Sequence, residues 1–454
     1  MVCAVGERAA QLRTAIDEGF PRVREELERL VQIPSVSAPG FDPQRVVESA
    51  RACAEILETS GAIGVRLLEV KGAHPAVYGE ASGREGGPTV LLYAHHDVQP
   101  PGPSDLWETP PFEPAERDGR LYGRGSSDDK SGIVTHAAAL RAFDARPPVK
   151  VKFLIEGEEE IGSAHLKDFL ERYTDLLGAD VFVLADSGTW GVGRPALTTS
   201  LRGLVDCVVE VRVLEHAVHS GLYGGPIPDA LTVLARTLAT LHDERGNVAV
   251  EGLAQGSRPD VDLSEEQLRA EAAVAPEVRL LGEGSITERM WAKPAVAVLG
   301  IDAPSIRESS NQIVPVARAR VSLRLAPQQD PGAAADALAR HLRAAAPWGA
   351  RVDVTPDGSA EGFAVSAQGR AFDAARGAMR EAWGVDPIDI GVGGTIPLAT
   401  QLARTFPDAA ILLTGAADPD CRAHGENESV HVEELKRACV AEALLLDNLA
   451  ERSG

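Results

Sequence analysis

The chain has 454 residues, of which 44% are hydrophobic and 25% charged, a composition typical of a soluble globular protein. Its formal net charge of −22 argues against nucleic acid as a partner, because that average field repels phosphates and no run of lysine or arginine offsets it. No apolar run approaches the roughly 20 residues needed to span a bilayer, so we expect no membrane association.

The N-terminal residues and the cysteines predict a cytoplasmic location. Residues 1–10 lack a basic segment followed by an apolar core, so we expect no secretory signal. The cysteines are few, odd in number and scattered: Cys3, Cys53, Cys207, Cys421 and Cys439. This pattern favours free thiols in a reducing compartment over a disulfide framework.

The first 200 residues and the last 50 alternate between helical and strand-like patterns. Apolar residues at helical spacing predict helices over 8–31, 43–60, 131–143, 163–173 and 432–449. Runs rich in β-branched residues predict strands over 65–70, 76–78, 89–93, 149–155, 181–184 and 410–413. Strands that alternate with helices indicate an α/β fold, with a mostly parallel sheet flanked by helices.

The region from about 200 to 366 has a different rhythm. It predicts strands over 205–213, 295–300 and 317–325 and helices over 228–242 and 331–345, and it contains no metal-type cluster. The length prior gives about three domains, and two large ones also fit. We therefore predict a discontinuous catalytic domain over 1–200 and 367–454, with an inserted α+β lid and dimerisation domain over 201–366.

Five short segments carry acid or imidazole groups that a metal ion can use. Each is expected at or just beyond the C-terminal end of a predicted strand, where open α/β sheets place their ligand sites. The segments are 93–100 (YAHHDVQP), 123–130 (GRGSSDDK), 156–163 (EGEEEIGS), 184–188 (LADSG) and 424–428 (HGENE). Together they supply nitrogen and oxygen ligands for two divalent cations and one spare carboxylate as a base.

The residue types suggest roles, although each segment alone also has a structural reading. His95 and Asp97 face the same side of a strand end, so Asp97 can orient a ligating His95, while His96 points the opposite way and is expected to be structural. Asp128 has the two oxygens that a bridging ligand needs, and Asp129 suits a helix N-cap.

The remaining segments offer a base and further ligands. In the run 158–160, one glutamate can ligate while its neighbour acts as the base, although a charged helix N-terminus explains the run equally well. Asp186 and His424 are weak signals alone. Cys421 also permits a zinc reading, but no second cysteine or histidine element accompanies it.

In combination and in this order, the segments resemble the M20 metallopeptidase family, which includes carnosinase-type dipeptidases, carboxypeptidase G2-like enzymes and aminoacylases. The resemblance implies one metal ion on His95, Asp128 and Asp186, and another on Asp128, Glu160 and His424. It implies Glu159 as general base and acid and Asp97 as the orienting carboxylate. It also implies a cis peptide between Asp128 and Asp129.

Further matches concern substrate contacts. The segment around His219 resembles the lid histidine that reaches a neighbouring subunit's active site and stabilises an oxyanion. Arg324 resembles the arginine that grips a substrate carboxylate, although a solvated strand residue is an equally good reading. Gly394 and Thr395 resemble a loop that cradles the substrate's C-terminal end, and Asn311 is a weaker match.

The sequence therefore predicts hydrolysis of the amide bond of dipeptides or similar small carboxylate-ended substrates by a homodimer. Zinc is the expected metal, and manganese or cobalt also suits imidazole and carboxylate ligands. The near alternative is an aminoacylase or deacetylase with the same machinery. The distant alternative is a non-catalytic relative that binds peptides or a partner protein.

Overall fold

The computed structural model describes residues 2–450, with side chains from residue 7 onward. The chain divides into two compact units. The first comprises Met1–Thr199, Val365–Ile390 and Ile396–Gly454, and the second comprises Ser200–Ala364 and Gly391–Thr395. The second unit is thus an insertion into the first, apart from a five-residue return at Gly391–Thr395.

The first unit is built on a mixed sheet with the order β1-β2-β6-β3-β7-β17-β8, with β16 also paired to β8. Strands β6, β3, β7 and β17 pair in parallel, whereas β1, β2 and β8 join antiparallel. The strands are β1 (Ile63–Leu68), β2 (Ala76–Ala81), β3 (Thr89–His95), β6 (Lys150–Glu156), β7 (Val181–Leu184), β8 (Ala196–Leu201), β16 (Ile388–Val392) and β17 (Ala410–Leu413). The parallel centre brings the C-terminal ends of three buried strands to one edge.

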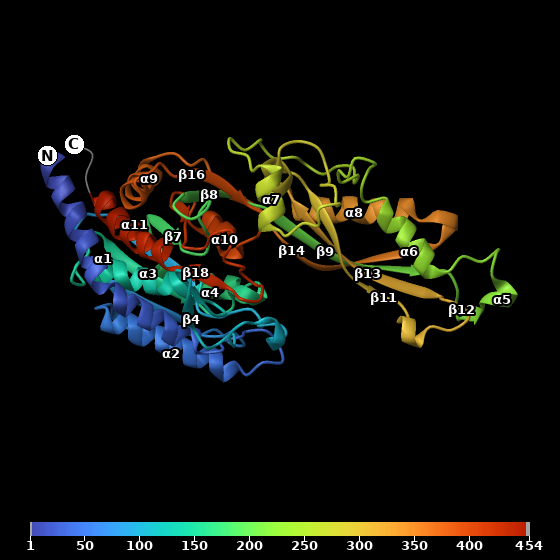
Figure 1. The fold of residues 1–454 in the computed structure, drawn as a ribbon, viewed down its shortest axis with the longest axis horizontal. Helices are drawn as coiled ribbons and strands as arrows, with labels where there is room; N and C mark the ends of the chain where they lie inside the picture. Colours follow the sequence, from blue (N-terminus) through green and yellow to red (C-terminus); the bar gives the residue numbers. More distant parts are fainter. Residues whose placement is uncertain (1, 451–454) are drawn as a thin grey trace. The chain divides into compact units, whose positions relative to one another are not determined.

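Helices cover both faces of this sheet (Figure 1). They are α1 (Val2–Val31), α2 (Pro43–Thr59), α3 (Lys130–Arg141), α4 (Leu166–Leu177), α9 (Arg370–Trp383), α10 (Pro397–Thr405) and α11 (Val432–Ala450). Alternate residues of β3 explain the two layers: Val90, Leu92 and Ala94 pack into the core shared with α1, α2, α3, α9 and α11. On the other face Phe182 stacks against Phe406, which follows α10.

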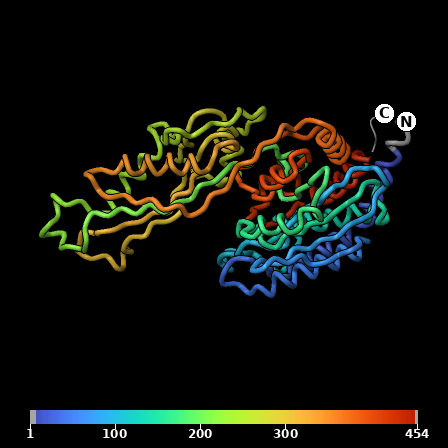
Figure 2. The backbone as a smooth tube through the Cα atoms, turned by 180° about the vertical axis from the view of Figure 1, so that it is seen from behind, coloured from blue at the N-terminus to red at the C-terminus, as the bar shows by residue number. Residues whose placement is uncertain are grey.

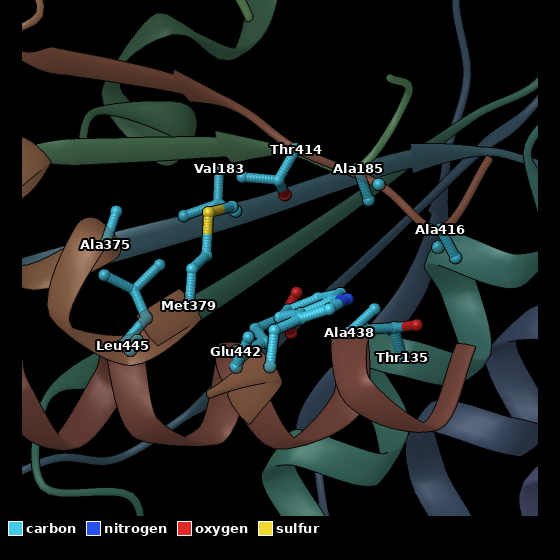
Figure 3. Close-up of a pocket in the computed structure, with 15 residues that line it drawn as sticks. Thr135, Val183, Ala185, Ala375, Met379, Thr414, Ala416, Ala438, Glu442 and Leu445 are labelled. Carbon is cyan, nitrogen blue, oxygen red and sulfur yellow. The ribbon is translucent and has the colours of Figure 1, made fainter. Parts of the chain in front are cut away.

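The chain ends of this unit lie side by side. Helices α1 and α11 pack against each other, as the blue and red segments in Figure 2 show. A cavity of about 30 Å³ remains between β7, β17 and the two helices α9 and α11 (Figure 3). Its lining is mostly apolar and rich in alanine, with Thr135, Thr414 and Glu442 as the polar side chains, so it is a small gap in the core packing.

A small antiparallel sheet joins two distant parts of the first unit. Strand β5 (Arg120–Tyr122) pairs with β4 (Ala115–Arg117) on one side and with β18 (Ser429–His431) on the other. Two 3-10 helices, η1 (Ser104–Leu106) and η2 (Glu159–Ile161), lie in the surrounding loops.

The second unit is an antiparallel sheet with the order β11-β13-β9-β14, covered on one face by α6 and α8. Its other face carries ion pairs such as Arg318 with Glu210 and Arg320 with Asp206. The elements are β9 (Gly203–Arg212), β10 (Val218–His219), α5 (Ser220–Tyr223), α6 (Ala230–Ala239), α7 (Glu265–Glu271), a π-helix η3 (Glu288–Ala292), β11 (Ala295–Asp302), η4 (Ile306–Glu308), β12 (Gln312–Ile313), β13 (Val316–Leu325), α8 (Pro331–Ala345), η5 (Pro347–Gly349), β14 (Arg351–Ala360) and β15 (Phe363–Ala364).

The predicted fold class is confirmed: the structure is α/β, with a mostly parallel central sheet flanked by helices. Two local predictions are corrected. The Asp128 segment follows β5 of the small sheet and not a strand of the main sheet. Asp129 occupies the N-cap position of α3 but makes no side-chain capping bond, because its Oδ2 instead accepts from the His95 N–H at 3.3 Å. None of the described helices is both long and apolar enough to cross a bilayer.

Candidate metal centre

The end of β3 presents two histidines to opposite sides. The Nε2 atom of His95 lies 3.0 Å from Asp128 Oδ1, and its Nδ1 lies 3.1 Å from the main-chain oxygen of Asp97. His96 turns away and its Nε2 contacts the Pro75 carbonyl at 2.9 Å. Burial lowers the pKa of His96 to about 4, so it is a neutral core residue. The alternation therefore leaves the Nε2 of His95 free to bind a ligand.

Asp97 organises the turn that follows β6. Its carboxylate accepts from the main-chain N–H groups of Glu159 (3.2 Å) and Glu160 (3.1 Å) and from the Ser37 hydroxyl (2.7 Å). The carboxylate lies 3.5 Å from His95 Nδ1, farther than the Asp97 carbonyl. Asp97 thus orients His95 mainly through its main chain, and its side chain holds the two glutamates.

The glutamates and Asp186 face the same space as His95. The Nε2 of His95 lies 4.0 Å from Glu159 Oε2 and 3.9 Å from Asp186 Oδ1. Glu160 is fixed by Gln99, whose main-chain N and side-chain Nε2 donate to its two carboxylate oxygens at 3.1 and 2.9 Å.

Two loops from distant parts of the chain complete the cluster. Asp128 lies in the loop between β5 and α3, and the peptide bond that joins it to Asp129 is cis, as the family resemblance predicts. His424 lies in the loop before β18, and its Nε2 is 3.0 Å from Asp128 Oδ2 and 3.2 Å from Glu160 Oε2. Asp128 therefore points one oxygen toward each histidine.

The pKa values of the buried acids shift in opposite directions: that of Asp128 is lowered, and those of Glu159, Glu160 and Asp186 are raised. Burial is the main cause and repulsion from neighbouring acids a further one; together they raise the pKa of Glu159 well above its usual range and also raise that of Glu160. Burial also raises the pKa of Asp186 well above its usual range. At Asp128 burial acts in the same direction, but hydrogen bonds from His424 and His95 outweigh it and lower the pKa. Such a cluster favours cations at its centre, because they relieve the repulsion between acids.

The donor set fits two divalent ions. Two groups of donor atoms each lie within 4.8 Å of one another: His95, Asp128 and Glu160, and His95, Glu159 and Asp186. A tetrahedral ion with bonds of about 2.0–2.1 Å separates its ligand atoms by about 3.3 Å. The separations of 3.0–3.2 Å around Asp128 match this value. Imidazole with carboxylate is also the chemistry that transition metal ions prefer.

The five predicted substrate-contact residues all lie in the second unit, where they form two groups. Arg324 NH1 lies 3.4 Å from Thr395 Oγ1, next to Gly394. His219 and Asn311 meet at the β10–β12 pair, where the Asn311 carbonyl accepts from Ser220 N at 3.0 Å. Strand β13 separates the two groups, and from Val316 to Arg324 it extends about 26 Å at roughly 3.3 Å per residue.

The sequence profile of "Peptidase family M20/M25/M40" matches residues 91–448. The chain belongs to the M20/M25/M40 peptidase family. It is a metal-dependent hydrolase, and the predicted family and enzyme class are confirmed.

Individual M20 relatives match over most of the chain. A cysteinylglycine-S-conjugate dipeptidase of Corynebacterium striatum is 36% identical over 79% of this chain and 80% of its own length. The crystal structure of human carnosine dipeptidase 1 has a TM-score of 0.83, with 26% identity over 97% of this chain and 98% of that one. The structure of the yeast dipeptidase Dug1p from Saccharomyces cerevisiae has a TM-score of 0.85 at 23% identity, over 98% and 99% of the two chains.

The structure also shows supporting residues that the sequence analysis did not single out in this M20 chain. Gln99 and Glu428 both lie inside the metal-site segments 93–100 and 424–428, so their place in these motifs could have identified them. No motif in the sequence pointed to Arg202. Its guanidinium lies against Gly393, and burial with repulsion from Arg324 lowers its pKa to about 10.

Proposed function

We propose that this chain is a dinuclear metallopeptidase that hydrolyses the amide bond of dipeptides with a free C-terminal carboxylate. The observation that carries the proposal is the convergence of two imidazoles and four carboxylates, drawn from five segments, around Asp128. The names of the relatives support small peptides as substrates: cysteinylglycine conjugates in one and β-alanyl-histidine in another.

The ligand assignment gives each ion one histidine. One ion takes His95, Asp128 and Asp186, and the other takes Asp128, Glu160 and His424. The 3.0 Å contacts of the two Asp128 oxygens with the two histidines support Asp128 as the bridge. Zinc is the proposed metal from this ligand set, with manganese and cobalt as the alternatives.

The residues around the ions move one proton. Bound divalent ions lower the pKa of water and polarise the substrate carbonyl. Glu159 then accepts a proton from the attacking water and later passes it to the leaving amine. Asp97 holds Glu159 in place by accepting from its main-chain N–H. Its Oε2 lies 4.0 Å from His95 Nε2, so the base stands beside the proposed ligands.

The second unit supplies substrate recognition as a lid domain. Arg324 with Thr395 and Gly394 is the proposed grip on the substrate carboxylate, since a guanidinium fork binds carboxylates in two parallel hydrogen bonds. Arg202 adds a second positive charge beside Arg324. His219 is the proposed oxyanion donor, and Asn311 supports its loop.

The separation of His219 from Arg324 supports a homodimer. A dipeptide spans about 7 Å, far less than the length of β13 between these residues. One substrate therefore contacts His219 of one protomer and Arg324 of its partner. Strand β11 supports assembly through the same unit, because it is an open sheet edge with exposed Val298, Leu299 and Ile301.

A cytoplasmic location remains part of the proposal. Four cysteines, Cys53, Cys207, Cys421 and Cys439, are buried and free among the residues whose side chains are described. Free thiols of this kind are typical of reducing compartments.

Turnover of a substrate panel separates the proposed dipeptidase from the aminoacylase alternative. The panel contains dipeptides such as Cys-Gly, the same dipeptides with an amidated C-terminus, and N-acetyl amino acids. We expect the free dipeptides to give the highest kcat/KM and amidation to lower it by at least about tenfold, since the Arg324 contact is lost. Preference for N-acetyl amino acids over every dipeptide contradicts the proposal.

A further inference from the structure

Two charged residues of the recognised motifs take no part in the proposed chemistry. Arg124 lies in the loop after β5 and Glu428 lies just before β18. Their side chains are 1% and 0% exposed, and Arg124 NH1 donates to Glu428 Oε2 at 2.7 Å. The pair joins positions 304 residues apart in the sequence.

The carboxylate of Glu428 is fully used by the Asp128 loop. Its Oε2 also accepts from Gly125 N at 2.9 Å. Its Oε1 accepts from Ser127 N and Ser127 Oγ, both at 3.0 Å, and from Asp128 N at 3.1 Å. An ionised carboxylate offers about four lone-pair sites, so no acceptor capacity remains for anything else. Glu428 therefore fixes the main chain that carries the bridging ligand.

Arg124 acts on the other loop. Its NH2 donates to the carbonyls of His424 (3.1 Å) and Gly425 (3.0 Å), and to Pro100 at 3.3 Å. His424 has a φ of 64° and Asn427 a φ of 60°, a left-handed conformation that side chains other than glycine seldom adopt. Such a loop needs contacts from outside to persist. Arg124 provides them at the residue that bears the second imidazole.

A role in stability alone does not account for the pair. A buried ion pair is about as stable as an apolar replacement of the same volume, because desolvation offsets the attraction. The pair also fixes the relative positions of the two loops. Arg124 NH1 binds Glu428, which holds the Asp128 loop, and Arg124 NH2 binds the carbonyls of the His424 loop. The pairing of β5 with β18 and the Gly123 N to Glu428 O bond at 2.9 Å bring the loops together, but neither reaches His424.

We propose that Arg124 and Glu428 are positioning residues that set the separation of Asp128 and His424: Glu428 holds Asp128, which both ion positions share, and Arg124 holds His424, which belongs to only one of them. The proposal rests on the two-ion site proposed above. The position formed by Asp128, Glu160 and His424 depends on Arg124. The position formed by His95, Asp128 and Asp186 contains no residue that Arg124 holds directly and is largely independent of it.

The test is calorimetric titration of the chelator-treated full-length protein with Zn²⁺. Arg124→Lys keeps one cationic donor for Glu428 but loses the second nitrogen, which holds His424 and Gly425. Arg141→Lys is the matched control, because Arg141 also binds a glutamate through its guanidinium, Glu26 at 2.9 and 3.2 Å, and none of its described contacts reaches either loop. Apo unfolding midpoints of both variants report any general loss of structure.

We expect the parental protein and Arg141→Lys to bind two ions alike. In Arg124→Lys, one ion binds as in the parental protein and the other about 10- to 100-fold more weakly, the usual effect of losing an outer contact to a ligand. Unchanged binding of both ions by Arg124→Lys overturns this inference alone. Equal weakening in Arg124→Lys and Arg141→Lys also overturns it. A parental protein that binds no ion overturns the proposed function as well.

A second variant keeps the test decisive if Arg124→Lys does not fold. Ser127→Ala removes one donor to Glu428 and leaves no buried charge unpaired. Because Asp128 is shared by both positions, we expect a severalfold loss of affinity at both ions, and visible absorption of the Co²⁺ form to change with it. Parental affinity and an unaltered spectrum contradict the inference.

Discussion

At the scale of single residues, the two carboxylate oxygens of Asp128 organise the candidate metal centre. Asp128 is the acid whose pKa is lowered, whereas burial and mutual repulsion raise those of Glu159 and Asp186. The difference arises because Asp128 contacts both His95 and His424 at 3.0 Å. The acids with raised pKa values are the ones that cations would ionise.

Replacing Glu159 tests its role directly. We expect Glu159→Gln to lower kcat by about 10²- to 10⁴-fold, the usual contribution of a general base, because the amide cannot accept the proton. The protein should still bind two ions, as measured by metal analysis alongside the kinetics. Loss of one ion in this variant would instead make Glu159 a ligand, as its grouping with His95 and Asp186 also permits.

Glu156 predicts a pH-dependent stability that is separate from catalysis. Burial raises its pKa to about 7, and its Oε2 accepts from the Tyr93 hydroxyl at 2.8 Å. Between pH 4.5 and 7 the unfolded carboxylate ionises while the folded one keeps its proton, so stability falls as pH rises. Glu156→Gln removes this loss.

The measurement is the unfolding free energy of the metal-free protein across this range. The advantage of Glu156→Gln over the parental protein should grow by about 3 kcal/mol from pH 4.5 to 7 and then stay constant. Glu80→Gln is the control of opposite sign: burial raises the Glu80 pKa, but hydrogen bonds with Tyr78 and Lys150 outweigh it and lower the pKa. A pH-independent difference for Glu156→Gln would contradict the assignment.

Prediction of individual site residues from the sequence depended more on motif matches than on expected geometry. Alternation along β3 correctly separated His95 from His96. It could not show that the Asp97 carboxylate mainly holds Glu159 and Glu160, because that contact joins two different strand ends. Gln99, which grips Glu160, has no charge to attract notice.

At the scale of elements, periodicity located most of the fold. The predicted bounds of β7, β17 and α8 agree with the structure. Buried strands with continuous apolar runs are easy to find, because both of their faces are covered. The strands β8 and β14 and the helix α9 were missed, and the loops that carry Asp128 and His424 could not be placed, because their positions are set by the short β5–β18 pairing.

Helix α1 contains an interior proline that we expect to lower the stability of the helix, and a substitution can remove this cost. Pro21 lies inside α1, is exposed and has no N–H to donate to residue 17. An interior proline costs a helix about 3 kcal/mol, partly offset by the smaller entropy of the unfolded chain. We expect Pro21→Ala to raise the unfolding midpoint of the first unit by a few degrees.

The matched control is Pro43→Ala. Pro43 stands at the first position of α2, behind the Asp42 cap, where a proline costs the helix nothing. We expect no rise in its midpoint. Equal effects of the two substitutions would show that Pro21 does not weaken α1.

At the scale of the whole molecule, the proposed homodimer rests on the distance between two groups of substrate contacts. Each second unit carries His219 at one end of β13 and Arg324 at the other, and the exposed apolar residues Leu222 and Ile306 lie in the segments next to β10 and β12. The sequence predicted an inserted domain from the different pattern of strands and helices over 200–366 and from its lack of a metal-type cluster, but it could not show the length of sheet between these residues.

Mixing two inactive variants tests the exchange of His219 between chains. His219→Ala lacks the donor and Glu159→Gln lacks the base, but a mixed dimer contains one site with both. After dissociation and statistical reassociation, we expect about a quarter of the parental activity, since half of the dimers are mixed and each has one complete site. No recovery in mixtures shown to contain mixed dimers would place His219 in its own chain's site.

The central claim is that two divalent ions are gathered by segments far apart in the sequence, and metal analysis of the purified active protein tests it most directly. We predict about two ions per chain, loss of turnover in step with their removal by a chelator, and recovery when two equivalents are returned. Full activity in protein that contains no divalent ion would contradict it.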